Sequence, residues 1–397
     1  MKEIIYFVGE YPKIANAFIN TALRELKRQG VEVALYSLNE PENPNVFYEG
    51  DYVFKDACYV KRETTIGKIL FSHLYFLIKI PRLYFSLWLD VFGGRINWKI
   101  FIKYIWVARS VEEKKTDLIN AFFVEGQTVI AMICARLLNL PFTFQVGGTD
   151  CYLERPREFS AIIDNSAKFF VCSSELKTRI GQQFKLDPDK IVMNMEGIEL
   201  SRFGSIKAEA HPVGTILFVG RQVRHKGVPL LLEAASRLKQ RGSKFKVVIV
   251  GDGQDWQEFK ELAKKLNAED IVSFAGAVRN LEIVPYYQNA SFFVLPSSLE
   301  GSPVVIMEAM ASGLPVISTK VSGIPDMITD GYNGFLIDPG DVDALTEKIE
   351  YFLSNPDKVR EMGQNAKANS TRFDIRNQTV NLIKTWEQIL NEKIRDR

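Results

Sequence analysis

Residues 292–311, FFVLPSSLEGSPVVIMEAMA, carry the strongest local signal in the chain. The run FFVL is apolar, bulky and short, which is typical of a buried parallel strand, and Pro296 ends it. Pro303 has a fixed φ that suits a first helical turn, so a helix is predicted from Val304 to Ala311. The free backbone N–H groups of such a turn form an anion site for a phosphate. The pattern therefore predicts a strand, a tight turn and a helix, with ligand-binding backbone at the turn.

Two glutamates eight positions apart, Glu300 and Glu308, bracket this turn. Glu308 is expected about a turn and a half into the helix, where a carboxylate can accept hydrogen bonds from two vicinal hydroxyls of a ribose. Glu300 stands at the turn itself, beside a bound phosphate. The simpler interpretation makes Glu300 a helix-start acid and Glu308 a solvated helix residue. The short pattern alone leaves both interpretations open.

The surrounding segment, from Phe274 to Asp341, resembles the donor-binding half of glycosyltransferase family 4, the retaining sugar transferases with the GT-B architecture. It contains an E-x7-E motif that runs into EAMASGLPV, then a Gly-bearing loop and the turn DGYNGFL, in the family's order. The resemblance covers essentially the whole chain, and the N-terminal half matches less well. It implies an α/β protein with two doubly wound, Rossmann-like domains that face a central cleft.

The alternation of predicted elements favours the same architecture. Strands alternate with helices twice along the chain, as parallel sheets require, and ligands then bind at the carboxyl ends of the strands. Residues 205–214 are polar and lack clear periodicity, so they are the expected linker. Residues 1–204 form the expected acceptor-side domain, and residues 215–372 form the expected donor-binding domain. In the resembled family a terminal helix, here residues 373–397, crosses back to the first domain.

Length and composition agree with a globular enzyme of two domains. The chain has 397 residues, of which 46% are hydrophobic and 25% charged, and a formal net charge of +2 does not favour nucleic acid as a partner. The four cysteines are scattered without a C-x-x-C pair, which favours neither a zinc site nor a disulfide framework. The chain starts with a predicted strand rather than a signal peptide. We therefore expect a cytoplasmic protein.

A glycine-bearing turn after the strand Thr215–Val219 contains two cations. Arg221 and Lys226 lie five positions apart, so both heads can converge on one diphosphate, although the spacing alone favours an ordinary solvated loop. In the resembled family, an Arg and a Lys at these positions hold the donor diphosphate. His225 is expected to point to solvent. The later turn GDG, residues 251–253, lacks the third glycine of a dinucleotide fingerprint and is interpreted as structural.

The resemblance assigns roles to further residues. Glu300 is expected beside the reacting sugar, with Asp150 and Asn120 facing it across the cleft as catalytic residues. The nucleotide base is expected against the turn that contains Val278 and Arg279. The full set of implied donor-binding residues comprises Gly9, Arg221, Lys226, Val278, Arg279, Gly301, Ser302, Pro303, Val304 and Glu308.

No metal or other cofactor is expected. Asp341 and Asp343 have the spelling of a D-x-D motif, which other sugar transferases use to hold a metal ion on a diphosphate. Here the pair opens an apolar helix, so an N-cap and a first-turn acid explain it. Arg221, Lys226 and a helix N-terminus are expected to stabilise the leaving diphosphate in place of a metal.

The N-terminal half departs from the family at one position. The family commonly reads H-G-x-D where this chain has Gly147, Gly148, Thr149 and Asp150, so the histidine that contacts the donor sugar is missing. The chain has three histidines, and none falls on an active-site position of the motif, which leaves a histidine base unsupported. Besides a glycosyltransferase, two alternatives stay open: a catalytically degenerate nucleotide-sugar-binding partner or sensor, and a nucleotide-sugar 2-epimerase of the same architecture.

The segment 68–106 is aromatic and basic. Such a segment with Trp and Phe on an apolar face suits the surface of an anionic membrane, where lipid-linked acceptors lie, and it is too interrupted to span a bilayer. Helices that only cover the first sheet are the alternative. We therefore expect a hexosyltransferase-type enzyme, peripheral to the inner face of the cell membrane, that moves a sugar from a nucleotide sugar to a lipid-linked glycan in cell-surface polysaccharide synthesis.

Overall fold

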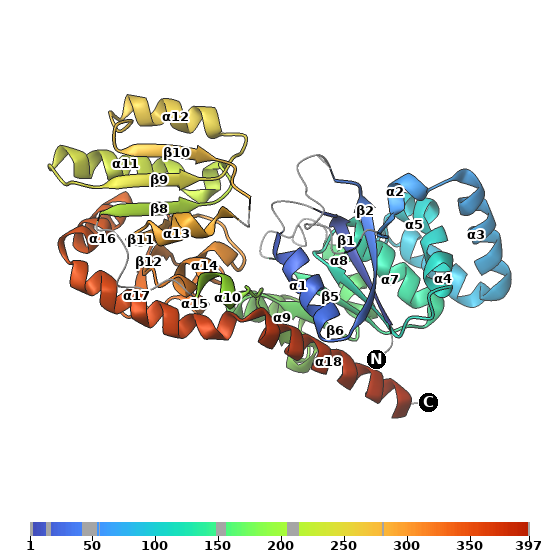
Figure 1. The fold of residues 1–397 in the computed structure, drawn as a ribbon. Coiled ribbons are helices and arrows are strands. Elements are labelled where there is room, and N and C mark those ends of the chain that lie inside the picture. Colours follow the sequence, from blue (N-terminus) through green and yellow to red (C-terminus); the bar gives the residue numbers. More distant parts are fainter. Residues whose placement is uncertain are drawn as a thin grey trace. The chain divides into compact units, whose positions relative to one another are not determined.

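The computed structural model describes residues 3–12, 17–41, 54, 56–147, 156–204, 214–279 and 282–395. Two compact units divide the chain, and each is built on one parallel sheet (Figure 1). The first unit comprises residues 1–194 and 379–397, and the second comprises residues 195–378. The expected fold class, two doubly wound α/β sheets, is confirmed.

The sheet of the first unit has seven strands in the order β3-β2-β1-β4-β5-β6-β7. All of its strand pairs are parallel. Its strands are β1 (Glu3–Glu10), β2 (Glu32–Asn39), β3 (Cys58–Tyr59), β4 (Leu118–Phe122), β5 (Phe142–Val146), β6 (Lys168–Val171) and β7 (Ile191–Met193).

Helices cover both faces of this sheet. Alternate residues of β1 point to opposite faces, so Ile5 and Phe7 join one core cluster while Ile4 and Tyr6 join another. The helices of the unit are α1 (Ala17–Arg28), α2 (Val60–Glu63), α3 (Ile66–Lys79), α4 (Pro81–Phe92), α5 (Trp98–Tyr104), α6 (Trp106–Glu112), α7 (Gly126–Leu138), α8 (Pro156–Asn165) and α9 (Ser174–Phe184).

The second sheet has six strands in the order β10-β9-β8-β11-β12-β13, again all parallel. Its strands are β8 (Thr215–Val219), β9 (Lys246–Val250), β10 (Val272–Gly276), β11 (Phe292–Leu295), β12 (Val316–Thr319) and β13 (Gly334–Ile337). Its helices are α10 (Leu200–Phe203), α11 (Val228–Gln240), α12 (Trp256–Lys265), α13 (Val284–Gln288), α14 (Val304–Ala311), α15 (Ile324–Met327), α16 (Val342–Ser354) and α17 (Pro356–Ser370).

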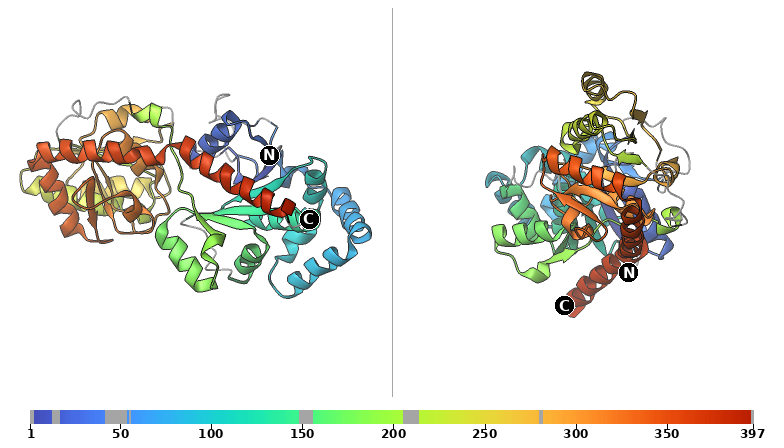
Figure 2. Two further views of the ribbon diagram at one scale, coloured as in Figure 1. Left: turned by 90° about the horizontal axis from the view of Figure 1, so that it is seen from below. Right: turned by 90° about the vertical axis from the view of Figure 1, so that its left-hand side faces the viewer.

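The last helix, α18 (Ile375–Arg395), begins in the second unit and continues in the first. Within the first unit α18 runs beside α1 (Figure 2), and its residues Leu382, Trp386 and Ile389 are buried in one cluster with residues of β1 and α1. Trp386 also donates from Nε1 to the hydroxyl of Thr143 on β5 at 3.1 Å. A buried indole with its N–H satisfied fixes this helix on the sheet.

The boundary between the units differs from the expected one. Met195 already belongs to the second unit, although the second domain was expected to start at Thr215. The physical reason is packing: Ile198 pairs with Asp374, and the ring of Phe203 packs edge-on against Tyr287 at 5.7 Å. Residues 205–213 of the expected linker lie outside the described residues.

Both sheets share one topological feature that places ligands. The first strand of each sheet lies between two strands that the chain reaches in opposite directions, β2 and β4 around β1, and β9 and β11 around β8. In doubly wound sheets, ligands bind beside the carboxyl ends of the strands at such a switch point. The edge between β8 and β11, and the edge between β1 and β4, are therefore the places to search.

Candidate functional site

The two loops at the switch point of the second unit pack closely against each other. Gly227, which ends the loop after β8, has φ +80°, and a Cβ there would lie 2.0 Å from the carbonyl oxygen of Pro296 after β11. Only glycine accepts both the conformation and the contact. Ser298 N–H donates to the carbonyl oxygen of His225 at 2.8 Å, which joins the same two loops.

A buried ion pair lies between these loops. Lys226 Nζ donates to both carboxylate oxygens of Glu300 at 2.8 Å, and the hydroxyl of Ser297 donates to Oε1 at 2.7 Å. Glu300 is 4% exposed, whereas Lys226 keeps a larger exposed fraction of 18%. An ammonium group has three donors, so Lys226 keeps one for a ligand while it holds Glu300. The sequence proposed roles for both residues but did not indicate that they pair.

The helix predicted from Val304 to Ala311 is α14, with these bounds. Pro303 occupies the N-cap with an extended backbone (φ −69°, ψ 105°) rather than the first helical turn. The N–H groups of Val304 and Val305 have no carbonyl partner within the helix, as at any helix start. The Gly301 carbonyl accepts from Gly323 N–H at 3.0 Å, which fixes the turn before the helix.

Ser302 and Glu196 add unsatisfied polar atoms beside this turn. Ser302 Oγ and Glu196 Oε2 are both buried, and among the described residues neither has a hydrogen-bond partner. Burial raises the pKa of Glu196 to about 7, and the nearby Ser302 hydroxyl opposes this rise. Glu196 is therefore partly protonated near neutral pH, which reduces the negative charge beside an anion site.

His225 does not point to solvent as expected. Its Nε2 atom is buried and lacks a partner among the described residues. Burial lowers the pKa of His225, and the charges of Lys226 and Arg221 lower it further. The ring is therefore neutral at pH 7, between the two cations that were assigned to a diphosphate.

Glu308 is buried on α14, so the interpretation of a solvated helix residue is wrong. The hydroxyl of Tyr287 on α13 donates to Glu308 Oε2 at 2.7 Å. Burial, followed by the charge of Glu308, raises the pKa of Tyr287 well above its usual range, so the phenol remains a donor. The ring of Tyr287 packs against Phe203 and Phe293, which fixes the hydroxyl against the carboxylate.

The remaining predicted donor residues lie on neighbouring loops. Arg221 is exposed, and its guanidinium has no side-chain partner among the residues that the structure describes. Val278 packs against the core, while the exposed Arg279 donates from Nε to Glu282 at 3.0 Å. Gly251 has φ +126° and a Cβ there would lie 2.0 Å from the Gly220 carbonyl oxygen, so the GDG turn is structural, as predicted.

The D-x-D sequence formed by Asp341 and Asp343 lies at the start of a helix, as predicted. Asp341 is the N-cap of α16 and accepts from Ala344 N–H at 2.9 Å. Asp343 lies in the first turn and forms an ion pair with Arg237. Both carboxylates are thus engaged in the structure of the helix.

The catalytic role expected for Asn120 does not agree with its position. Asn120 is 1% exposed in the middle of β4, where its Oδ1 accepts from the Thr143 hydroxyl at 2.8 Å. It also bonds to the hydroxyl of Tyr6, and Thr143 in turn accepts from Trp386. The alternation of the strand turns Asn120 toward the helices instead of the ligand edge. Asp150 lies outside the described residues, and Gly9 lies at the end of β1.

The segment 68–106 divides into two faces. Its buried aromatic residues, Phe76, Tyr84, Phe101, Tyr104 and Trp106, belong to the core of the first unit, as helices that cover a sheet require. Helices α3 to α5 also expose large apolar side chains, which together we call the hairpin surface: Ile66, Leu70, Phe71, Leu74, Leu77, Ile78, Leu83, Phe85, Leu89, Phe92 and Trp98. Because α3 contacts both α4 and α5, these side chains lie on neighbouring helices, and apolar surface exposed in this way marks a candidate interaction site.

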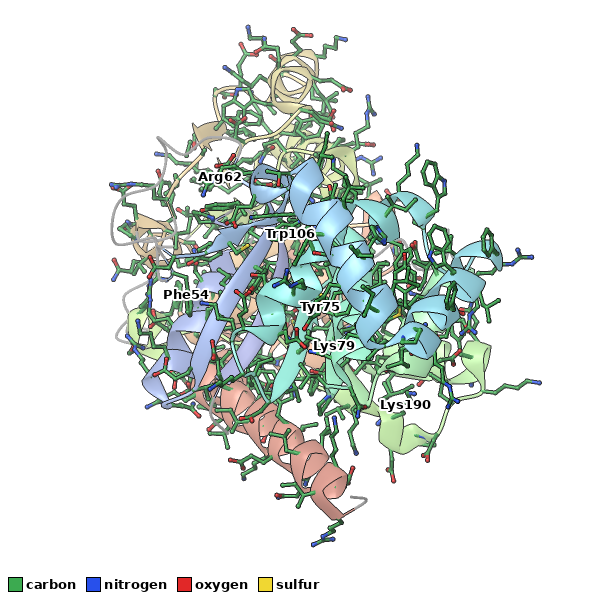
Figure 3. All side chains as sticks on the ribbon, turned by 90° about the vertical axis from the view of Figure 1, so that its right-hand side faces the viewer. Phe54, Arg62, Tyr75, Lys79, Trp106 and Lys190 are labelled. Carbon is green, nitrogen blue, oxygen red and sulfur yellow. The ribbon has the colours of Figure 1, made fainter. Side chains whose placement is uncertain are left out.

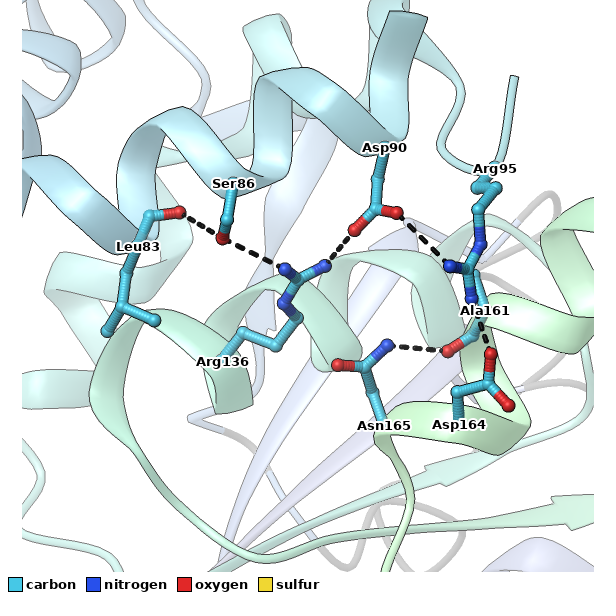
Figure 4. Close-up of polar contacts among 8 residues, drawn as sticks. All are labelled: Leu83, Ser86, Asp90, Arg95, Arg136, Ala161, Asp164 and Asn165. Atoms are coloured by element: carbon cyan, nitrogen blue, oxygen red, sulfur yellow. Dashed lines mark hydrogen bonds and ion pairs between the residues drawn. The ribbon is translucent and has the colours of Figure 1, made fainter. Parts of the chain in front are cut away.

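Polar contacts hold α3 and α4 to the unit. Arg136 of α7 pairs with Asp90 and donates to Ser86 Oγ at 3.0 Å, and Arg95 bridges Asp90 to Asp164 (Figure 4). On the α3 side, Lys79 donates to the Tyr75 hydroxyl at 2.6 Å and to Glu112 at 2.7 Å (Figure 3). The hairpin surface is thus presented by anchored helices, and no helix in the described ranges is long and apolar enough to cross a membrane.

Three residues of the site were missed or misjudged in the sequence. Tyr287 and Glu196 lie outside the E-x7-E motif, and nothing in their local pattern indicates that they approach it. In the sequence, His225 lies between Arg221 and Lys226. Its position beside two cations that were expected to bind a ligand is the signal that could have identified it as a site residue. Tyr287 and Glu196 are brought to the site by packing between segments that are distant in the sequence.

Comparisons with known proteins identify the family that the second unit matches. Residues 205–369 match the family model "Glycosyl transferases group 1". The amylovoran biosynthesis glycosyltransferase AmsK of Erwinia amylovora is 37% identical over 164 residues, which is 40% of this chain and 40% of that relative. In Campylobacter jejuni, the GalNAc-alpha-(1->4)-GalNAc-alpha-(1->3)-diNAcBac-PP-undecaprenol alpha-1,4-N-acetyl-D-galactosaminyltransferase is 26% identical over 294 residues, 73% of this chain and 80% of the relative.

Among solved structures, Anabaena HepE in complex with UDP superposes with a TM-score of 0.74 at 16% identity, covering 98% of this chain and 100% of that one. This likeness shows the GT-B fold. The family match covers most of the second unit with its switch-point loops, so this unit belongs to the group 1 glycosyltransferases, glycosyltransferase family 4.

Proposed function

We propose that this chain is a retaining, metal-independent glycosyltransferase that moves a sugar from a nucleotide sugar to a hydroxyl of a lipid-linked glycan during cell-surface polysaccharide synthesis. The observation that carries the proposal is the cluster at the β8–β11 switch point. There the Lys226–Glu300 pair, the exposed Arg221 and the start of α14 meet on adjacent loops. Cations and free backbone N–H groups suit a diphosphate, and a carboxylate beside them suits the hydroxyls of a sugar.

The donor is assigned to the second unit. Arg221 and the remaining donor of Lys226 bind the diphosphate, with the turn from Gly301 to Val304 beneath it. Glu308, held by Tyr287, accepts hydrogen bonds from the ribose. UDP in the HepE structure supports a nucleotide ligand for this fold, although the nucleotide of the present enzyme is open.

The reaction itself requires little of the side chains. The bond between the anomeric carbon and the donor phosphate breaks, and a bond to the acceptor hydroxyl oxygen forms on the same face. The departing phosphate takes the proton of that hydroxyl, so no histidine base is required. Arg221, Lys226 and the α14 N-terminus offset the charge that develops on the leaving diphosphate, which is the work a metal ion does in other transferases.

The acceptor is proposed from relatives and from the hairpin surface. AmsK is named for the synthesis of amylovoran, and the Campylobacter relative carries undecaprenol in the name of its substrate. The hairpin surface pairs exposed apolar residues with Arg82, Lys99 and Lys103, which have no acidic partner within the described ranges. Such a combination suits the anionic inner face of a cell membrane, where a lipid-linked glycan is presented.

The first prediction concerns Arg221. Lys226→Ala would leave Glu300 as a buried carboxylate without its partner, which destabilises the fold as well as the site. Arg221→Ala avoids this problem because Arg221 is exposed. It should weaken binding of the cognate nucleoside diphosphate by about 1.5 to 3 kcal/mol in calorimetric titration, with the melting temperature unchanged.

Arg224→Ala is the matched control for Arg221→Ala, since Arg224 is an exposed arginine of the same loop that pairs with Glu258. It should leave the affinity unchanged. Equal affinities for wild type and Arg221→Ala would remove Arg221 from the donor site.

The second prediction tests the ribose assignment through Tyr287. Tyr287→Phe keeps the ring packing and removes the hydroxyl that holds Glu308. It should weaken binding of a ribonucleoside diphosphate by about 1 kcal/mol, and binding of its 2′,3′-dideoxy analogue much less. Glu308→Gln should show the same preference with a larger loss. If both analogues lose affinity equally in both variants, Glu308 does not bind the ribose.

The third prediction is a pH dependence that originates in Glu196. Because burial raises the pKa of this carboxyl to about 7, it gains negative charge as pH rises from 6 to 8. Affinity for the nucleoside diphosphate should therefore fall across this window in the wild type. Glu196→Gln should remove that fall. Parallel pH profiles for wild type and Glu196→Gln would contradict the effect.

The fourth prediction tests the membrane surface. The purified protein should sediment with phosphatidylglycerol-containing vesicles, and added salt should weaken the binding. Joint charge reversal of Lys99 and Lys103 should reduce it by about 1 kcal/mol or more per cation. Reversal of Lys260 and Lys264 on α12 is the control, because Lys260 also lies over a tryptophan ring, as Lys99 does.

Nucleotide binding should survive the charge reversal in the hairpin. Vesicle binding that responds neither to salt nor to the Lys99 and Lys103 changes would contradict the electrostatic part of the proposal. Concentration-dependent dimerisation without vesicle binding would instead assign the hairpin surface to a second copy of the chain.

A further inference from the structure

Helices α3 and α4 form a layer at the outer edge of the first unit (Figure 1). The two helices contact each other, and both reach the core of the unit, where Phe76 of α3 and Tyr84 and Leu87 of α4 are buried. Each helix therefore has one face fixed against the unit and one face turned away from it. The outward faces belong to the hairpin surface.

The outward face of α3 carries an apolar stripe along the whole helix. Its exposed residues recur every fourth position: Ile66, Leu70, Leu74 and Ile78. This spacing places the side chains above one another on one side of a helix. The two cations of α3 lie outside the stripe, and both are paired with acids of the unit, Lys68 with Glu63 and Lys79 with Glu112. No charge therefore interrupts the stripe.

Helix α4 extends the apolar surface with larger side chains. Phe85, Leu89 and Phe92 follow at spacings of four and three, so they share one side of the helix. Leu89 and Phe92 are 73% and 80% exposed, and Trp98 at the start of α5 is exposed as well. Because the exposed residues run along both helices rather than gathering at the turn between them, a flat partner surface fits them best.

The charges of this surface select its partner. Within the described ranges, Arg82, Lys99 and Lys103 have no acidic partner. Segment 66–103 contains a single acid, Asp90, whose carboxylate is already held by two arginines. In a two-fold dimer the surface would face itself, so the unpaired cations would meet cations of the second copy. The phosphates of anionic lipids complement these cations, and acyl chains complement the apolar stripes.

We propose that the hairpin surface inserts lengthwise into one leaflet of a lipid bilayer, with α3 and α4 lying in the membrane plane and their apolar stripes among the acyl chains. This inference deepens the proposed membrane role of the surface and rests on it. It adds that insertion, rather than charge, supplies most of the affinity. The surface exposes eleven large apolar side chains against three unpaired cations, and full burial of one such side chain stabilises more than one surface cation does.

The test uses vesicles without net charge. The full chain is sedimented with dioleoyl phosphatidylcholine vesicles at about 1 M salt, where charges are screened beyond about 3 Å. The wild type should bind, and the double variant Leu89→Ser, Phe92→Ser should bind about tenfold less or weaker still. Both side chains are exposed, so the melting temperature should not change.

A second measurement reports insertion directly. Lipids brominated on the acyl chain should quench tryptophan fluorescence of the bound wild type. The quenching should be smaller in Trp98→Phe, because Trp98 is the exposed tryptophan of the hairpin surface.

The matched control removes exposed apolar side chains elsewhere on the chain. Ile394 on α18 is 70% exposed and Tyr351 on α16 is 38% exposed. The double variant Ile394→Ser, Tyr351→Ser should bind the neutral vesicles as the wild type does. The nucleoside diphosphate affinity of every variant should equal that of the wild type, because none of these residues belongs to the proposed donor site.

The outcomes separate this inference from the proposed function. Binding to phosphatidylglycerol vesicles but not to neutral ones would overturn insertion and leave electrostatic docking. Equal binding of the wild type and the Leu89→Ser, Phe92→Ser variant to neutral vesicles would also overturn it. Dimerisation that this variant loses, without vesicle binding by the wild type, would assign the surface to a second copy. If the wild type inserts but binds no nucleoside diphosphate, the glycosyltransferase function fails while insertion stands.

Discussion

The ion pair between Lys226 and Glu300 is the interaction on which the proposed donor site depends. It joins the loop after β8 to the loop after β11, and Gly227 lets those loops approach until backbone touches backbone. Because Glu300 is buried, its charge is tolerable only with Lys226 and Ser297 in place. The same pair keeps a cation and a carboxylate side by side at the start of α14. A diphosphate and a sugar, joined in one donor, require these opposite charges at neighbouring points.

The parallel sheet of the second unit explains where the proposed donor site lies. At its switch point, Arg221, Lys226 and the start of α14 lie on adjacent loops and offer positive charge to an anion. The sheet explains why ligands bind at this edge, whereas the side chains after each strand decide which ligand binds.

Much of the fold followed from local pattern, whereas contacts across the fold did not. The strands Thr215–Val219 and Phe292–Leu295 were predicted with their observed bounds, because short apolar runs between turn residues specify buried parallel strands. The two-residue β3 was missed because it is too short to show a period, and β13 because glycine starts a brief, half-buried run. Lys226 and Glu300 are 74 positions apart, so no local pattern indicates their pairing. The expectation for Asn120 did not take its side-chain direction into account. Neighbouring residues of a β-strand point to opposite faces of the sheet, and the position of Asn120 in the family motif alone does not show which face its side chain occupies.

The central claim, that the donor nucleotide binds at the β8–β11 switch point, can be tested most directly by hydrogen exchange. Backbone amide exchange of the full chain would be followed with and without saturating UDP, GDP and ADP in turn. The account predicts that the cognate nucleotide slows exchange in residues 220–227 and at the start of α14, with Glu308 and its neighbours following. Protection confined to the GDG turn, or to the first unit, would contradict the assignment of the donor to this edge.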